Sequence, residues 1–519
     1  MILEGRDIYF RFGRRMTNLL KLSLFLCVLP AALVLTSIAA GQSGAYQELY
    51  RPQVHFSPRM HWTNDPNGLV FFEGEYHLFF QYNPFGDEWG HMSWGHAVSR
   101  DLLHWRELAV AIPEHDGEMV FTGSVVVDKN TSGLCGTQVE CLVAVYTGHR
   151  STPELTRQTQ NLAYSLDHGR TWTRYRRNPV IDLGMADFRD PSVFWDEPLK
   201  GWVMAVALPK LHKVRFYTSR DLKRWTELSD FGPAGEVGGV WECPDLLHIP
   251  AGDGVGGMWM LKVGLNPGAL QGGSGEQYFL GDFDGRHFTP SSEPGWHGWT
   301  NYGKDDYCAI SFNHLPARAQ PVLLGWMNNW QYASKLPTSP WRGQMSLPRR
   351  LALLRDKDGL TAKQTPVVAG LREGKPGDPF SGASGSKVPL EAPFEMELNF
   401  VPGEEKLFGI RLRTGEQEWT EIGFDREKQQ FFMDRTKSGA ILAEGFAART
   451  TAPLAPGRPF DLRLVVDRSS IEAYAQDGTI AMTNLIFPPS GHTRVELFSK
   501  SGKPVDAKGT SWKLRSIWK

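Results

Sequence analysis

Cysteine is scarce in this chain, and neither cysteine nor histidine forms a cluster with the spacing of a metal site. Only 5 of the 519 residues are Cys and 15 are His, without an HExxH motif or a Cys pair at zinc-ligand spacing. We therefore expect no metal and no cofactor. Cys135 and Cys141 flank a glycine-containing loop and could form a disulfide in an exported protein. Cys243 and Cys308 are expected to be isolated, buried thiols.

The body of the chain also lacks a run of basic residues. Its 56 Lys and Arg nearly balance 57 Asp and Glu, which leaves a formal net charge of −1. Proteins that bind nucleic acid need a basic patch or stripe to neutralise phosphates. The charge pattern therefore excludes nucleic acid as a partner.

Long hydrophobic runs are absent after the N-terminal region. One apolar run extends from Leu22 to Leu35, with basic residues before it and small residues after it, which is typical of a secretory signal peptide. A membrane anchor is the alternative, but Pro30 interrupts the run, which is shorter than the ~20 residues of a membrane span. We predict a signal peptide over residues 1–41. Its removal would leave a secreted or periplasmic monomer without membrane contact.

Stretches that favour helix are few, whereas 54 Gly and 34 Pro divide the chain into short segments. This pattern is typical of strands joined by turns. An Asp followed by an aromatic residue recurs in four similar segments: Ser99–Trp105, Ser165–Trp172, Ser219–Trp225 and Gly281–Phe288. In each copy an apolar strand precedes the Asp, which can cap the turn through backbone amides. One copy per four-stranded blade, with strands around 307–330 closing the ring, predicts an all-β, five-bladed β-propeller over residues 50–355.

The composition changes beyond about residue 350. A stretch rich in Gly, Ser, Pro and Lys predicts a linker or exposed crossing over residues 356–388. Alternating strands such as Phe394–Phe400 follow, and Ser470–Tyr474 is expected to pair in a hairpin with Thr479–Met482. The period of two with solvated charges predicts a C-terminal β-sandwich over residues 389–519.

Three short motifs each place a carboxylate beside a turn that contains Gly or Pro: Trp62–Gly68, Arg189–Pro191 and Trp241–Pro244. Asp65 would lie at a strand end with a constrained backbone, which suits a nucleophile that faces a sugar. Asp190 follows Arg189, which would lower the pKa of Asp190 and keep it ionised, so that it favours positive charge on a sugar ring. Glu242 lies between bulky apolar neighbours, an environment suited to a general acid.

Taken singly, these carboxylates fit an acidic turn, a surface ion pair and a glutamate at a turn equally well. Their combination is more specific, because each comes from a different repeat and the ends of propeller strands can meet at one channel mouth. Two carboxylates that flank a glycosidic bond are the minimum for glycoside hydrolysis. The residues therefore predict a glycoside hydrolase.

In this order and spacing, Trp-x-Asn-Asp-Pro-Asn-Gly, Arg-Asp-Pro and Glu-Cys-Pro resemble the signatures of the β-fructosidases of glycoside hydrolase family 32. The resemblance extends from about residue 50 to the C-terminus and includes four further segments: Trp94–Ser99, Phe121–Ser124, Trp341–Gly343 and Asp467–Glu472. It implies a five-bladed propeller followed by a β-sandwich, in agreement with the repeats. Two positions depart from the family pattern, since Thr63 stands where Met is usual and Thr122 where Ser is usual.

Carried over residue by residue, the resemblance implies that Asp65 is the nucleophile, Glu242 the acid/base and Asp190 the transition-state stabiliser. It also implies a set of residues that bind the terminal fructosyl unit: Asn64, Gln81, Trp89, Phe121, Thr122 and Arg189. The implied reaction is a retaining double displacement through a covalent fructosyl-enzyme.

The choice of fructan depends on weaker signals. Gly325–Tyr332, which includes the binding candidate Trp330, and Pro340–Gly343 are more similar to bacterial levanases and exo-inulinases than to plant invertases. We expect release of terminal β-D-fructose from levan or inulin, and cleavage of sucrose. A fructosyltransferase that uses the same intermediate and a non-catalytic glycan-binding propeller are the alternatives. Ser165–Trp172 also matches the Asp-box of sialidases, but a sialidase needs several boxes and three arginines that bind a carboxylate.

Overall fold

The computed structural model describes residues 46–518 except 252–255, 294, 357–358, 379, 381–387, 490–491 and 503–504. Within these ranges the regular elements are strands and three short 3-10 helices, η1 (Pro209–Leu211), η2 (Ala333–Lys335) and η3 (Ala369–Leu371). The signal peptide expected over residues 1–41 lies outside the described residues. No helix in the described ranges is both long and apolar enough to cross a membrane.

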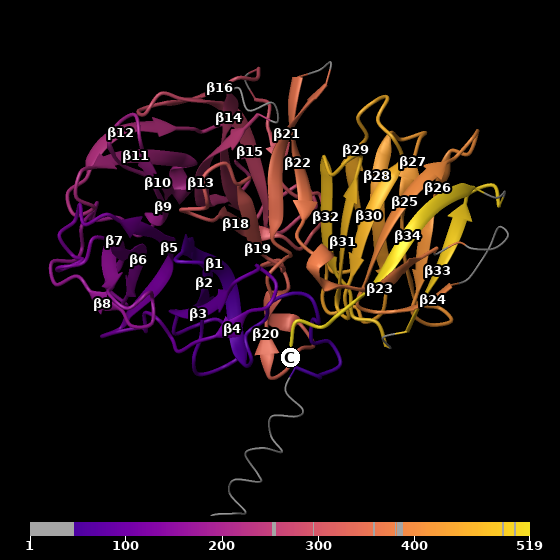
Figure 1. The fold of residues 1–519 in the computed structure, drawn as a ribbon, viewed down its shortest axis with the longest axis horizontal. Coiled ribbons are helices and arrows are strands. Elements are labelled where there is room, and N and C mark those ends of the chain that lie inside the picture. The colour runs from indigo at the N-terminus through magenta and orange to yellow at the C-terminus, as the bar shows by residue number, and fades with distance from the viewer. Residues whose placement is uncertain are drawn as a thin grey trace, which may run out of the picture. The chain divides into compact units, whose positions relative to one another are not determined.

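Five small sheets, antiparallel except for one added strand, are formed by the chain between residues 61 and 366 (Figure 1). The first contains β1 (His61–Phe72), β2 (Glu75–Tyr82), β3 (Ser93–Ser99) and β4 (Arg106–Glu107), with β20 (Trp341–Arg342) parallel to β1. The second contains β5 (Glu118–Asp128), β6 (Cys141–Ser151), β7 (Thr156–Ser165) and β8 (Thr173–Arg174). The third contains β9 (Arg189–Asp196), β10 (Gly201–Leu208), β11 (Lys213–Ser219) and β12 (Thr226–Phe231).

The fourth and fifth small sheets continue the same hairpin pattern. The fourth contains β13 (Val240–Pro250), β14 (Gly257–Asn266), β15 (Gly275–Phe283), β16 (Phe288–Pro290) and β17 (Gly298–Trp299). The fifth contains β18 (Tyr307–Ser311), β19 (Val322–Trp326), β21 (Arg349–Asp356) and β22 (Gly359–Pro366). The segment expected as a crossing at 356–388 therefore supplies β22 to this sheet.

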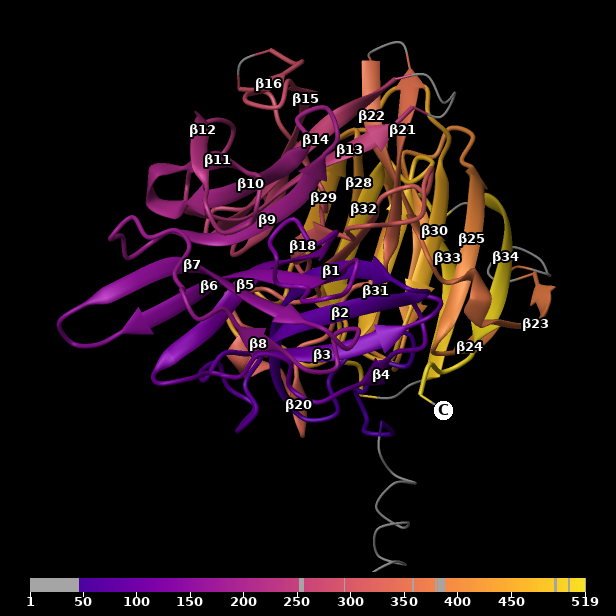
Figure 2. The same cartoon turned by 60° about the vertical axis from the view of Figure 1, so that its left-hand side comes forward.

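The small sheets follow one another in a closed cycle of contacts. The first strand of each contacts the first strand of the next, in the order β1, β5, β9, β13, β18 and back to β1; Figure 2 shows β1, β5 and β9 beside one another. Buried side chains fill the spaces between consecutive sheets, for example Phe79 with Tyr146, and Phe216 with Phe279. Because every first strand meets two others, the starts of these strands are brought to one place.

The recurring Asp–aromatic motif forms the turn between the third and fourth strands of four small sheets. Asp101 Oδ1 accepts hydrogen bonds of 2.9 Å from the backbone N–H groups of Leu103 and His104. Trp105 Nε1 donates to the carbonyl oxygen of Leu102. Backbone amides are capped in the same way by three further aspartates: Asp167, Asp221 and Asp284. The predicted role of the Asp is confirmed at each repeat.

Two six-stranded antiparallel sheets form the rest of the chain. In spatial order, the first contains β23 (Arg372–Gly377), β34 (Asp506–Leu514), β25 (Phe394–Val401), β30 (Asp461–Val466), β31 (Ser470–Ala475) and β32 (Ile480–Leu485). The second contains β24 (Val388–Glu391), β33 (His492–Ser499), β26 (Leu407–Arg413), β27 (Trp419–Asp425), β28 (Gln430–Lys437) and β29 (Arg449–Pro453). Met396 and Leu464 of one sheet share a core with Ile410 and Ile422 of the other, so the sheets pack face to face.

A buried histidine ties the segment before β1 to the turn and strand that follow β30. His55 Nδ1 lies 2.8 Å from Asp467 Oδ2, and His55 Nε2 lies 3.2 Å from Glu472 Oε1, with all three side chains inaccessible to solvent. Burial alone would lower the pKa of His55, but hydrogen bonds and charges of the two carboxylates raise it to about 9. The imidazolium therefore joins two parts of the fold that are far apart in the sequence.

We expect His55→Gln to lower the free energy of unfolding by about 3 kcal/mol at pH 6, because it leaves two buried carboxylates without a cation. A raised folded-state pKa stabilises fully below the unfolded value, 6.5, and the contribution is lost as pH rises towards 9. Wild type should therefore lose stability between these values, and the variant should lose less. Urea unfolding across this window measures both slopes, and equal slopes would contradict a charged His55.

Candidate active site

The first strand of each small sheet carries the same irregularity, in which two residues stand opposite one on the neighbouring strand. It falls between Thr63 and Pro66 in β1 and between Val120 and Gly123 in β5. In the other sheets it encloses three residue pairs: Asp190-Pro191 in β9, Cys243-Pro244 in β13 and Cys308-Ala309 in β18. Such bulges bend a strand and re-aim its side chains. They lie where the five strands meet.

Side chains from these bulges and from the adjoining loops line one pocket of about 270 Å³. The pocket contains every residue that the sequence predicts for the site: Asn64, Asp65, Gln81, Trp89, Phe121, Thr122, Arg189, Asp190, Glu242 and Trp330. The sequence did not indicate one further lining residue, Asn266 at the end of β14. Residues up to 266 positions apart in the sequence are thus brought together.

Asp65 lies in the β1 bulge, half-buried. Thr122 Oγ1 donates a 2.9 Å hydrogen bond to Asp65 Oδ2, whereas Oδ1 has no hydrogen-bond partner among the described residues. Burial and the negative charges of Asp190 and Glu242 raise the pKa of Asp65 to about 7, against the bond from Thr122. One carboxylate oxygen is therefore held by a hydrogen bond, whereas the other is not. Thr122, which stands where Ser is usual, keeps the hydroxyl function.

Glu242 is held from both sides by donors on neighbouring strands. Arg189 Nε and Nη2 lie 3.1 and 3.0 Å from Oε1, and the Tyr307 hydroxyl donates a 2.5 Å bond to Oε2. Burial, then the charge of Glu242, raises the pKa of Tyr307 well above 10.0, so this hydroxyl stays protonated. Arg189, Glu242 and Tyr307 each directly precede the bulge of their own strand. The position directly before the bulge is thus used in the same way in three consecutive sheets, and it brings the three side chains together.

Asp190 is buried, with a backbone φ of 66°. Its Oδ2 accepts a 2.9 Å hydrogen bond from the backbone N–H of Cys243. Arg189 does lower the pKa of Asp190, but the expectation of a net lowering is wrong, because burial and the charge of Glu242 outweigh Arg189 and raise the pKa to about 7. The guanidinium of Arg189 donates hydrogen bonds to Glu242, to Asp187 at 3.0 Å and to Gln158 at 3.3 Å. Burial therefore raises the pKa of Asp190, as it does that of Asp65.

Aromatic rings form the sides of the pocket. Trp89 is 46% exposed and packs edge-on against Phe121, with ring centroids 6.1 Å apart. Phe121 in turn stacks on His149 at 4.3 Å. On another wall, Trp330 stacks with the buried Trp62 at 6.0 Å. Ring faces of this kind bind the apolar faces of sugars, and carboxylates and amides beside them can bind hydroxyls.

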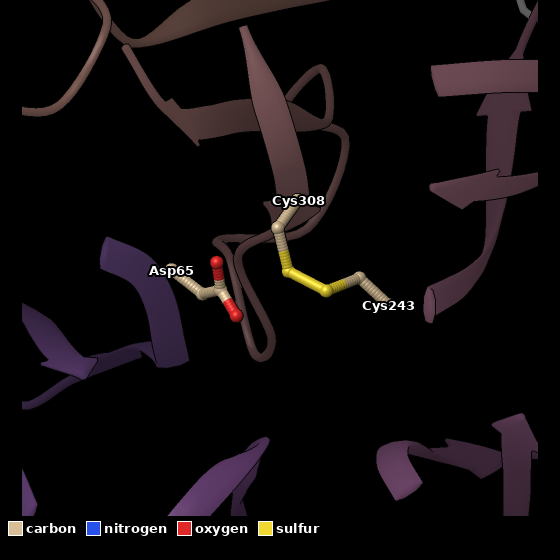
Figure 3. Close-up of side chains that lie close together, drawn as sticks. All are labelled: Asp65, Cys243 and Cys308. Carbon is tan, nitrogen blue, oxygen red and sulfur yellow. A yellow bond between two sulfur atoms is a disulfide. The ribbon is translucent and has the colours of Figure 1, made fainter. Parts of the chain in front are cut away.

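The expectation of isolated thiols at Cys243 and Cys308 is wrong, because the two sulfur atoms form a disulfide. Their side chains are buried, as expected. Figure 3 shows the bond beside Asp65, whose carboxylate has an oxygen within 4.8 Å of the sulfurs. Cys135 and Cys141 form a second disulfide, beside Asp128. Sulfur atoms bonded in this way do not offer thiolates to a metal ion.

Tyr307→Phe removes one hydrogen bond to Glu242 and leaves the ring in place. A bond to a charged group contributes about 1.5–3 kcal/mol, so we expect a fall in kcat/KM of about tenfold or more, measured on sucrose, a substrate that the family resemblance implies. Tyr146→Phe, a buried tyrosine of β6 outside the pocket, is the matched control and should keep its activity. Equal activity of both variants would mean that Tyr307 does not act on Glu242.

Comparison with known proteins places the chain in a family. The profile of the glycosyl hydrolases family 32 N-terminal domain matches residues 55–366, and that of the family 32 C-terminal domain matches residues 359–516. A levanase of Bacillus subtilis (strain 168) is 43% identical over 503 residues, which cover 93% of this chain and 73% of that protein. An extracellular exo-inulinase of Aspergillus awamori is 40% identical over 516 residues, covering 91% and 96%.

Solved structures give the same result. The crystal structure of the exo-inulinase from Aspergillus awamori superposes with a TM-score of 0.86 at 40% identity, covering 91% of this chain and 100% of that one. A fructofuranosidase from Schwanniomyces occidentalis complexed with fructose superposes with a TM-score of 0.81 at 33% identity, covering 91% and 99%. The chain belongs to glycoside hydrolase family 32.

Proposed function

We propose that the protein is a fructan β-fructosidase that releases terminal β-D-fructose from levan or inulin and also cleaves sucrose. The observation that carries the proposal is the convergence of Asp65, Asp190 and Glu242 in one aromatic-walled pocket. Relatives named levanase, exo-inulinase and invertase support the substrate class. The small volume of the pocket, about 270 Å³, favours a terminal sugar unit over the middle of a chain and therefore exo attack.

The proposed reaction is a double displacement with retention. Glu242 protonates the leaving oxygen while Asp65 Oδ1 attacks the anomeric C2 of fructose, and a fructosyl ester of Asp65 forms. Glu242 then takes a proton from water, which displaces the ester and releases β-fructose. Asp190 stabilises the positive charge that develops on the ring in both steps.

The five small sheets are proposed to be blades of a β-propeller, built from residues 50–355 together with β22, and followed by a β-sandwich over 389–519. The cyclic order of contacts between β1, β5, β9, β13 and β18 supports the propeller. It explains why the bulges converge, because the first strands of propeller blades surround one axis. We also propose export by the leader over residues 1–41 and action as a monomer; the word extracellular in relatives' names supports export.

The experiment that tests the function is a time course of products from levan, inulin and sucrose, separated by chromatography. We expect fructose alone to appear from both fructans from the first minutes, with equal amounts of glucose and fructose from sucrose. Fructan fragments of intermediate length would contradict exo attack. Growing oligosaccharides at high sucrose would identify a fructosyltransferase, and binding of levan without any product would identify a glycan-binding protein.

A further inference from the structure

The Cys243–Cys308 disulfide joins two neighbouring small sheets under the pocket. It links Cys243 of β13 to Cys308 of β18, which lies 65 residues further along the sequence. The Cα atoms of the two cysteines are 5.4 Å apart. Both side chains are at most 2% exposed. Both residues lie in the bulges of their strands and have a positive φ, 46° at Cys243 and 50° at Cys308. Residues with a side chain adopt this conformation only where the surroundings impose it.

Each cysteine either contacts a carboxylate of the pocket itself or directly follows a residue that does. Cys243 follows Glu242 directly, and its backbone N–H donates to Asp190 Oδ2 at 2.9 Å. Cys308 follows Tyr307, whose hydroxyl donates to Glu242 Oε2 at 2.5 Å. The bond therefore closes a short loop that runs from Glu242 through both sulfurs to Tyr307 and back. A shift of either strand would change these contacts together.

Close packing against β14 also restricts the movement of Tyr307. A Cβ added at Gly264, which lies opposite Glu242 on β14, would come within 2.9 Å of the Tyr307 ring. The ring is thus seated directly against the backbone of β14. Packing against β14 thus fixes the ring of Tyr307, and the disulfide fixes the strand that carries it.

We propose that the Cys243–Cys308 disulfide is a positioning bond for catalysis, which holds Glu242 and the Asp190 contact in register across two sheets. The inference rests on the proposed function of these carboxylates. Cys243 and Cys308 take no part in bond making, and they act through their neighbours. Because a displacement of about 1 Å at a reacting group can cost about 100-fold in rate, loss of the bond lowers kcat more than it raises KM.

The chain supplies a matched control in its other disulfide. Cys135 lies in the loop that joins β5 to β6, and Cys141, 6 residues further along, is the first residue of β6; both are buried. Neither residue lines the pocket. Removing this bond also eliminates a buried disulfide, but one whose cysteines do not line the pocket. The variant therefore reports any general effect of losing a disulfide.

The test compares the double variants Cys243→Ala/Cys308→Ala and Cys135→Ala/Cys141→Ala with wild type, using initial rates on sucrose and inulin and thermal unfolding. We expect kcat per folded molecule to fall about tenfold in the first variant, with KM within about twofold. The second variant should keep wild-type kcat, whatever its melting temperature. Unchanged kcat in the first variant with a lowered melting temperature would overturn the proposal and leave a purely structural bond.

A second measurement serves if the first variant does not fold. The protein with Cys135→Ala/Cys141→Ala is reduced with a phosphine, which is oxidised to its oxide while Cys243 and Cys308 take up two electrons and two protons. Activity should fall as free thiols appear and return on reoxidation; full activity with both thiols free overturns the proposal. Thiol counting and peptide mapping of wild type are independent of catalysis. A wild type that hydrolyses no fructan would defeat the proposed function, whereas an active wild type without the bond would defeat only this inference.

Discussion

Asp65→Asn is expected to lower kcat on levan, inulin and sucrose by at least about 10⁴-fold, the scale of losses when a covalent nucleophile is removed. An amide keeps the shape of the carboxyl group and can still accept the Thr122 hydrogen bond, but it does not form the fructosyl ester. Substrate binding should change little, because the aromatic walls remain. Initial rates at saturating substrate and binding of fructose by calorimetry measure the two effects.

The same variant should be more stable than wild type at neutral pH. The pKa of Asp65 is about 7 in the folded protein, against an ordinary value of 3.8 for an aspartate. The free energy of unfolding of wild type therefore falls as pH rises from 3.8 to 7. A neutral side chain removes that loss. Asp187→Asn, which touches Arg189 outside the pocket, is the control and should stay within about tenfold of wild-type activity. Asp65→Asn with activity in that range would exclude Asp65 as nucleophile.

Glu242→Ala is expected to lower kcat on sucrose and fructans by about 10³-fold, because sugar leaving groups need protonation. A nitrophenyl β-fructofuranoside has a leaving group that departs without a proton, so its first step should be almost unaffected. The second step lacks a base, and the fructosyl-enzyme should accumulate. Added azide, which attacks without a base, should restore turnover and yield fructosyl azide of β configuration.

The matched control for Glu242→Ala is Tyr307→Phe, which weakens the support of Glu242 and keeps its carboxylate. It should need no azide, and it should lose less kcat/KM on the nitrophenyl substrate than on sucrose, because only sucrose needs Glu242 as an acid. If Glu242→Ala loses activity equally on both substrates and azide gives no rescue, Glu242 is not the acid/base. Steady-state rates and NMR of the azide product are sufficient for this comparison.

The sequence indicated which carboxylates lie together in one pocket, because its signals are local. Asp65, Asp190 and Glu242 each stand in a motif where Pro or Gly fixes the backbone, and the Asp–aromatic turns mark the end of each repeat. Cap geometry follows from such turns alone, as at Asp101. The position of the three carboxylates in separate repeats was enough to predict that they meet.

The features that sequence reasoning missed depend on which strands are neighbours. Tyr307 contacts Glu242 only because β18 lies beside β13, and the same adjacency pairs Cys243 with Cys308. The shared register of Arg189, Glu242 and Tyr307 before their bulges is the one signal that could have indicated Tyr307. The raised pKa of Asp190 was missed for another reason: the adjacent Arg189 is visible in the sequence, whereas burial and the direction of its guanidinium are not.

Mass spectrometry of the Glu242→Ala variant, quenched during turnover of a nitrophenyl β-fructofuranoside, shows whether Asp65 forms a covalent bond to fructose while Glu242 serves as acid/base. We predict a protein heavier by one fructosyl unit, with the label on the peptide that contains Asp65. A fructosyl group on Asp190 or on any other side chain would contradict it.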